Sequence, residues 1–230
     1  MKKVILLALI AIVGVATANA QLQFGVKAGL NVSNLSGLEN DYDESGVDYS
    51  NPYKLGFHVG VAAQYLFTPQ VGIETGLYYS ALGAKQEYKI SEAGYHATLA
   101  TKYNPSYLQL PISVLYKFGI GQDLSLYPSV GIYLGYGLGG KAKLGLEDTN
   151  IPVDELDIDE EEYDFFGKTD GEEWTNRFDY GATFGLTLQY TNYTIGLGYD
   201  LGLAKINKES ESGVKDLKNA NIKVSVGYLF

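Results

Sequence analysis

The strongest constraint on this chain is an alternation of apolar with polar or glycine residues that recurs eight times. A period of two is typical of a β-strand whose two faces lie in different environments. The segments are 22–32, 55–67, 71–81, 107–118, 124–140, 178–190, 193–206 and 220–230. We therefore expect an all-β, antiparallel fold built from eight strands.

The connections between these segments alternate between short and long. Residues 68–70, 119–123 and 191–192 form three short connections, whereas 33–53, 82–106, 141–177 and 207–219 form four long ones. Structureless loops of such length are uncommon in compact soluble domains. Up-and-down transmembrane β-barrels have short periplasmic turns and long extracellular loops. The pattern predicts an eight-stranded barrel of that kind, with both termini at the periplasmic end.

Two barrel types differ in which face of the strands points outward. A soluble ligand-binding barrel turns its apolar face inward, whereas an outer-membrane barrel turns it toward lipid and lines its lumen with polar residues. The chain has 28 Gly, and many of them share the polar face. Glycine weakens a water-exposed strand but suits a narrow lumen, so we favour the outer-membrane barrel, with a secreted soluble barrel as an alternative.

Aromatic residues gather where strands meet the short turns and the C-terminus. Such an arrangement is typical of the aromatic girdle at a membrane interface. The residues are Tyr65, Phe67, Tyr116, Phe118, Tyr190, Tyr193, Tyr228 and Phe230.

The N-terminus has the features of a secretory signal peptide. Lys2 and Lys3 precede an uncharged apolar run over residues 4–16, and Ala18 and Ala20 flank an A-x-A site before Gln21. The run is too short to span a membrane as a helix. We expect residues 1–20 to be removed, which leaves an outer-membrane β-barrel domain over 21–230.

Composition excludes several classes of function. The formal charge of −10 becomes −12 once the two N-terminal lysines are removed, and this disfavours nucleic-acid binding, which needs clustered bases. The chain has no Cys, so a disulfide framework, a Cys-ligated zinc site and a thiol nucleophile are excluded. We expect no cofactor and no metal site.

Short pieces of the sequence are similar to one family. The pieces are 24–31 (FGVKAGLN), 56–61 (GFHVGV) running to 67–69 (FTP), 107–112 (YLQLPI), 196–199 (GLGY) with 202–203 (GL), and 226–230 (VGYLF). They resemble the PorT-like outer-membrane β-barrel proteins of Bacteroidetes over essentially all of the mature chain. The resemblance implies a small porin-like or OmpX-like barrel, and it implies no particular activity.

The last strand has a second possible role besides facing lipid. Its apolar positions alternate up to a terminal Phe, which resembles the signal read by the barrel assembly machinery of the outer membrane. These positions are Ile222, Val224, Val226, Tyr228 and Phe230.

Polar residues at inward positions predict a hydrogen-bonded network that plugs the lumen. They are Lys27, His58, Gln64, Glu74, Gln109, Lys117, Asp200 and Lys223. The strand order places Glu74 near Lys117, Asp200 near Lys223, and Lys27 across the closing seam from Lys223. Buried charges must be paired, and eight strands leave an interior that side chains just fill. We expect little conductance, with a narrow conduit as the alternative.

Catalytic motifs are not recognisable. His58 and His96 are the only histidines, and neither lies at a motif spacing from a Ser or Asp. Enzymes of the outer membrane need such groups clustered, so we do not expect an enzyme.

The long segment 143–179 is strongly acidic. It contains 14 Asp and Glu against Lys143, Lys168 and Arg177, a net charge of −11, and the loop 33–53 adds five acids and no base. A solvated loop, divalent-cation binding and attraction of a basic partner remain open. Calcium is weakly supported, because the acidic runs lack a complete loop motif. Phe165, Phe166 and Trp174 could anchor this loop over the barrel mouth or contact a partner.

Together these features predict a monomeric outer-membrane barrel that contacts lipid and has a structural or interaction role at the cell surface, with a surface or envelope protein as the candidate partner of its acidic loops. A small porin for ions or small solutes is the second candidate function.

Overall fold

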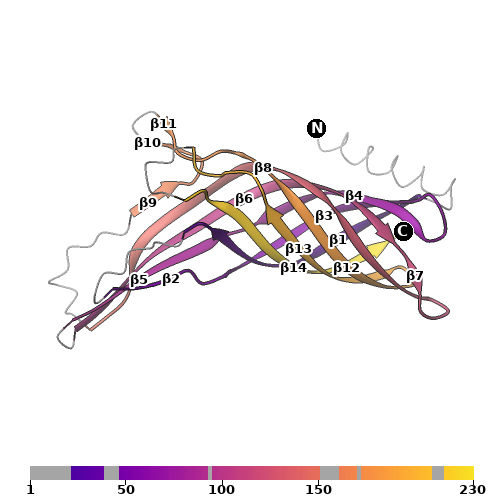
Figure 1. The fold of residues 1–230 in the computed structure, drawn as a ribbon, viewed down its shortest axis with the longest axis horizontal. Coiled ribbons are helices and arrows are strands. Elements are labelled where there is room, and N and C mark those ends of the chain that lie inside the picture. The colour runs from indigo at the N-terminus through magenta and orange to yellow at the C-terminus, as the bar shows by residue number, and fades with distance from the viewer. Residues whose placement is uncertain (1–21, 39–46, 93–94, 151–160, 170–171, 209–214) are drawn as a thin grey trace, which may run out of the picture.

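The computed structural model describes residues 22–38, 47–92, 95–150, 161–169, 172–208 and 215–230 (Figure 1). Within these ranges the chain is all-β, with one sheet of twelve strands and a second sheet of two. No helix in the described part of the chain is long and apolar enough to cross a membrane. The predicted signal peptide and its cleavage site at Ala18, Ala20 and Gln21 lie outside the described residues.

Eight strands of the large sheet pair in a closed cycle. Each strand pairs antiparallel with the next in the chain order of the eight, and the last pairs with the first from Gly25↔Leu229 to Ser36↔Lys218. The cycle is β1 (Leu22–Ser36), β3 (Lys54–Leu66), β4 (Val71–Ala81), β6 (Tyr95–Tyr116), β8 (Leu124–Thr149), β12 (Phe178–Tyr190), β13 (Tyr193–Gly202) and β14 (Lys218–Leu229). We call it the closed sheet.

The closed sheet is apolar outside and polar inside. Leu30 and Val226 on the outer face are each 60% exposed, whereas Asn31 and Gln64 on the inner face are fully buried. Alternation of side chains along each strand produces this division. A continuous apolar outer surface of this extent is suited to lipid rather than to water.

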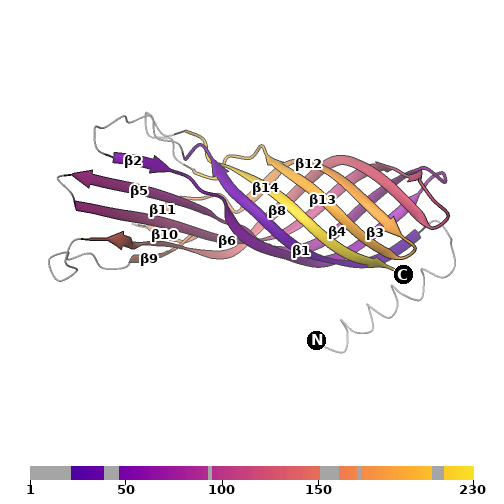
Figure 2. The ribbon, with the colours of Figure 1, turned by 90° about the horizontal axis from the view of Figure 1, so that it is seen from below.

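Strands β6 and β8 continue beyond the closed sheet and carry further strands with them. β2 (Val47–Ser50) pairs with β5 (Ala84–Glu92), which pairs with β6, and β9 (Glu161–Asp164) pairs with β8. Together with residues 95–106 of β6 and 139–149 of β8 they form the extension sheet, which projects to the left in Figures 1 and 2. β7 (Phe118–Gly119) pairs with β8 at the opposite end, and β10 (Lys168–Thr169) pairs with β11 (Glu172–Glu173).

The large sheet has twelve strands and not eight, although eight of them form the closed cycle. The segments 33–53, 82–106 and 141–177, which we expected to be loops, therefore contain strands. The alternation there is weak in hydrophobicity, since Lys85 and Glu87 alternate with Gln86 and Tyr88. Ladder hydrogen bonds to β6 and cross-strand pairs supply the stabilisation that an apolar face would otherwise supply.

The short connections lie at the predicted positions, at the end of the closed sheet opposite the extension sheet. In the third one, Thr191 has a φ of 51°. The predicted seventh strand ends at Gly202 and not at residue 206. The N–H groups of Leu203 and Ala204 both donate to the same carbonyl, that of Tyr180 on β12, at 2.9 and 3.1 Å, so residue-by-residue pairing ends there.

Candidate functional site

Two ion pairs lie in the interior of the closed sheet. Lys27 on β1 lies 2.6 Å from Glu74 on β4, and Lys223 on β14 lies 2.6 Å from Asp200 on β13. Thr183 donates a further hydrogen bond of 2.7 Å to the Asp200 carboxylate. Asp200 is 2% exposed, so its charge depends on these partners for stabilisation.

Lys117 lies apart from Glu74, in contrast to the expected grouping. The ladder between β4 and β6 places Glu74 opposite Ser113. The Lys117 ammonium instead donates to the side-chain carbonyl of Gln189 on β12, at 2.8 Å. Sequence reasoning placed the two residues on adjacent strands but could not show that Lys27, which is two strands from Glu74, reaches it across the interior.

The two predicted glutamines are both buried inside the closed sheet. The Gln64 amide donates to Glu74 at 3.4 Å, and Gln109 lines the central cavity.

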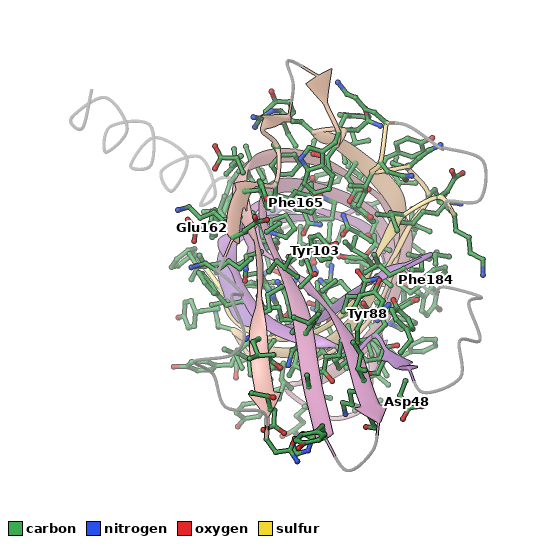
Figure 3. All side chains as sticks on the ribbon, turned by 90° about the vertical axis from the view of Figure 1, so that its left-hand side faces the viewer. Asp48, Tyr88, Tyr103, Glu162, Phe165 and Phe184 are labelled. Atoms are coloured by element: carbon green, nitrogen blue, oxygen red, sulfur yellow. The ribbon has the colours of Figure 1, made fainter. Side chains whose placement is uncertain are left out.

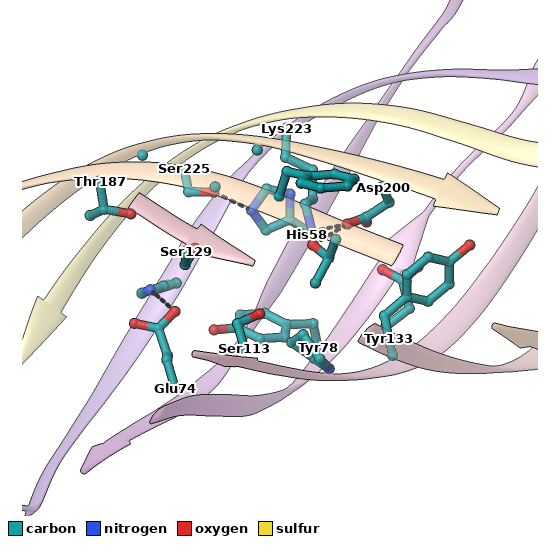
Figure 4. A pocket seen from close by; sticks show the side chains of 18 of the residues that line it. His58, Glu74, Tyr78, Ser113, Ser129, Tyr133, Thr187, Asp200, Lys223 and Ser225 are labelled. Atoms are coloured by element: carbon teal, nitrogen blue, oxygen red, sulfur yellow. Dashed lines mark hydrogen bonds and ion pairs between the residues drawn. The ribbon is translucent and has the colours of Figure 1, made fainter. Parts of the chain in front are cut away.

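His58 connects three strands by hydrogen bonds. Its Nδ1 lies 2.8 Å from Oδ1 of Asn31 on β1. Its Nε2 lies 3.0 Å from Oγ of Ser225 on β14, a contact that Figure 4 shows. A neutral ring that donates from Nδ1 and accepts at Nε2 satisfies both contacts. Spacing along the chain could not predict this cluster, because the three residues lie far apart in sequence.

This order of groups resembles the Ser, His and Asn arrangement of nucleophilic hydrolases. Acyl transfer also needs donors aimed at the developing oxyanion, and the backbone N–H groups of paired strands already donate within the ladders. The cavity beside His58 has a volume of about 100 Å³, which suits a few water molecules and not an ester substrate. We interpret the cluster as part of the interior hydrogen-bond network.

Tyrosines fill much of the remaining interior. Tyr107, Tyr127 and Tyr133 are each no more than 1% exposed, although aromatics were expected largely at the lipid interface. The alternation in the sequence does indicate that these tyrosines point inward, because they share a strand face with Gln109, Ser113 and other polar positions. Their volume is accommodated by glycine, as a Cβ on Gly181 would lie 2.7 Å from the Tyr133 ring.

Asp179 belongs to this interior and not to the acidic loop with which the sequence grouped it. It is 1% exposed, and it accepts hydrogen bonds from Tyr133 at 3.1 Å and from the Asn219 amide at 2.8 Å. Asp179 is the second residue of β12, and its side chain points inward.

An aromatic cluster closes the interior at the extension end. We call it the aromatic cap, and it consists of Tyr103, Tyr107, Phe165, Phe166 and Trp174. The ring of Phe165 lies 4.9 Å from that of Phe166 and 5.3 Å from that of Trp174, and Phe166 lies 5.6 Å from Tyr107. Figure 3 looks onto this end and shows Phe165 beside Tyr103. The sequence left open whether these residues anchor the loop over the mouth or contact a partner. Phe165 and Phe166 are buried in the packing over the mouth.

Two further contacts hold the aromatic cap. The Arg177 guanidinium lies 5.1 Å from the centre of the Phe166 ring and donates to the carbonyls of Gly137 and Phe166, at 3.0 and 3.1 Å. A Cβ on Gly137 would lie 2.3 Å from the Phe166 ring, so the ring occupies the space that glycine leaves.

The outer face of the extension sheet carries ion pairs beyond the end of the closed sheet. Lys102 lies 2.5 Å from Glu147, and Lys85 contacts both Glu147 and Glu87. Hydrogen bonds from Lys102 and Lys85 hold the pKa of Glu147 below its usual range. In the described part of the chain, no group of three or more His, Cys, Asp or Glu is placed to hold a metal ion.

Residues 17–208 match the family model described as outer membrane protein beta-barrel domain. The chain belongs to this family. The protein is thus an integral β-barrel of the outer membrane, which confirms the predicted location and sets aside the secreted soluble alternative. The closed sheet is its barrel, and the polar interior is the lumen.

Solved structures of outer-membrane proteins are similar to the chain at low identity. Ail, the attachment invasion locus protein of Yersinia pestis, is 16% identical over 91% of this chain and 99% of its own, with a TM-score of 0.39. OprG of Pseudomonas aeruginosa is 14% identical over 90% and 95%, with a TM-score of 0.40. Outer membrane protein W of E. coli is 14% identical over 93% and 100%, with a TM-score of 0.41. No curated protein matches the chain.

Proposed function

We propose that the protein is a monomeric, eight-stranded, non-conducting barrel with a structural or interaction role at the cell surface. The observation that carries this proposal is the filled lumen. Two ion pairs, the His58 cluster and the buried tyrosines occupy its length, and the aromatic cap covers its extension end.

The lumen resists ion passage for a physical reason. Its cavity of about 100 Å³ is lined by the Lys27–Glu74 pair and by Tyr133, and Figure 4 shows Glu74 and Tyr133 at its two sides. An ion that crossed would have to displace buried charged pairs, and breaking such a pair is strongly unfavourable. The polar lining of the cavity favours a small porin instead.

Planar-bilayer recording tests the proposal. Folded protein, verified by its heat-dependent shift in gel mobility, is expected to give no stable single-channel steps at neutral pH. A protein-free bilayer and an unfolded sample serve as controls. Reproducible steps that scale with the amount of folded protein would show a conduit, and the small-porin function would replace this one.

We also propose that the last strand carries the assembly signal. Its residues Val226 and Phe230 face outward and are exposed, and the Phe230 N–H donates to the Phe24 carbonyl at the seam, at 2.7 Å. Phe230→Asp is expected to lower the yield of heat-modifiable barrel in the outer membrane severalfold. Phe118→Asp is the matched control, because Phe118 is an exposed aromatic at the same end. Equal losses in the two variants would indicate a general girdle effect and no signal.

The proposal also includes cleavage of a signal peptide and membership of a subfamily. The basic and apolar N-terminal segment supports cleavage after Ala20, and an intact mass that does not begin at Gln21 would contradict it. The short pieces given above support membership of the PorT-like branch. An alignment that leaves those pieces outside the positions shared by that branch would argue against it.

A further inference from the structure

The extension sheet carries a row of residues with the form of a small aromatic pocket. Ala142 on β8 lies opposite Tyr103 on β6 and opposite Tyr163 on β9. Neighbouring strands lie about 4.8 Å apart, so the backbones of the two tyrosines are roughly 10 Å apart, and the residue between them carries only a methyl group. Trp174 completes a groove that these residues line together with Thr101 and Leu144.

The pocket is supported from below and open above. The buried ring of Phe165 packs against Tyr103 at 6.0 Å and against Trp174 at 5.3 Å, both edge to face. Tyr163 on the opposite wall is 48% exposed. The Tyr103 and Trp174 rings are thus held in place before any ligand arrives, which lowers the entropic cost of binding.

One carboxylate lies on the face of the pocket, and the two nearest lysines of β8 lie on the opposite face. Glu161 lies opposite Leu144 on the same face as Tyr163, and its carboxylate accepts a hydrogen bond from the Tyr163 hydroxyl. Lys141 and Lys143 occupy the alternate positions of β8, on the other face, where both pair with Glu162. Segment 143–179 as a whole has 14 acids and three bases.

We propose that this pocket is an aromatic cage for an Arg or Lys side chain on a basic peptide segment of a protein partner. Aromatic faces attract a cation placed within about 6 Å of their centres, and the strand spacing lets one cation between Tyr103 and Tyr163 contact both rings. The acidic segment raises the local concentration of a cationic partner. The inference deepens the surface-interaction role proposed above and rests on it.

Trp174 is the only tryptophan of the chain, so its fluorescence reports directly on the pocket. Full-length protein in lipid nanodiscs is titrated with a flexible Arg-Gly peptide and with the same peptide in which citrulline replaces arginine. Calorimetry provides an independent affinity. Saturable binding of the arginine peptide, about tenfold or more tighter than that of the citrulline peptide, is expected.

Variants separate the cage from general electrostatic attraction. Tyr163→Leu keeps an apolar side chain but removes the ring, and it is expected to weaken binding by about 2- to 30-fold. Tyr163→Phe should bind like the native protein. Glu161→Gln should weaken binding and reduce its salt dependence, whereas Glu162→Gln, on the opposite face, is the matched control and should change affinity less than about twofold.

Several outcomes would overturn the cage. They are equal binding of the citrulline peptide, equal effects of Glu161→Gln and Glu162→Gln, or native affinity in Tyr163→Leu that still shows the heat-dependent gel shift. Free arginine amide that binds as tightly as the peptide would show a small-amine site and no partner segment. The absence of conductance is measured separately, so failure of the cage leaves the filled-lumen proposal standing.

Discussion

Strands β6 and β8 each run through two regions, the barrel and the extension sheet, and the polarity of their faces reverses between the two. In the barrel part of β6, Leu110 faces outward and Gln109 faces the lumen. In the extension part, the outward position Lys102 is charged, and the inward position Tyr103 packs against Phe165 within the aromatic cap. The same strand therefore has apolar outward side chains where it faces lipid and charged ones where it faces water, while its backbone pairing continues.

The point of reversal indicates where the membrane ends. Along the outer face of β8, apolar side chains continue to Leu138, and charge begins at Lys141. The register between β6 and β8 shifts at Ser106/Tyr107, and Gly140 has a φ of 158°. A β-bulge re-aims the side chains that follow it, and here it lies between the two regions.

Buried and exposed ion pairs provide the largest expected contrast between the regions. Asp200→Ala leaves the Lys223 ammonium in the lumen without its partner, and we expect it to lower the free energy of unfolding by about 3–5 kcal/mol. Urea-induced unfolding from phospholipid vesicles measures the change. Asp200→Leu combined with Lys223→Met should recover most of the loss, because the double variant leaves no unpaired charge. A double variant as unstable as the single one would contradict this explanation.

The matched change in the extension sheet is Glu147→Gln. Glu147 pairs with Lys85 and Lys102 near water, with about a quarter of its side chain exposed. Ion pairs of this kind contribute less than about 1 kcal/mol. A loss as large as that of Asp200→Ala would mean that the two regions do not differ in solvent access as described.

Reciprocal changes on the outer face of β8 sharpen the contrast further. Ile132, near the middle of the apolar band, is 54% exposed, and Ile132→Lys is expected to cost about 2–4 kcal/mol because it moves a charge into lipid. Lys143→Leu, on the extension, should change stability by less than about 1 kcal/mol. The same vesicle-based unfolding applies to both. Comparable costs for the two changes would place Ile132 outside the lipid.

The barrel strands were predictable because one face of each strand contacts lipid and the other the polar lumen, and this produces a period-two alternation in the sequence. The segments 71–81 and 178–190 coincide with β4 and β12, and 55–67 differs from β3 by one residue at each end. The extension sheet was missed because its strands have no continuous apolar face. Its stabilisation comes from pairing with β6 and β8 and from the aromatic cap, and neither leaves a period-two hydrophobic signal.

The candidate sites were predictable as a set of residues but not as a set of contacts. Inward polar positions such as Lys27, His58 and Asp200 follow from alternation alone. Which of them meet depends on register and on reach across the lumen, so Glu74 pairs with Lys27 and not with Lys117. The row of Tyr103, Ala142 and Tyr163 has no counterpart in the sequence, since three strands must align before those residues become neighbours.

The sequence by itself therefore determined the all-β antiparallel architecture, the two faces of each barrel strand and the outer-membrane location, because these depend on local periodicity and on the solvent that each face requires. The tertiary structure alone decided the closure of the aromatic cap, the partners of the buried charges and the aromatic pocket on the extension sheet. Those features depend on contacts between residues distant in the chain, and no local pattern encodes the register that brings them together.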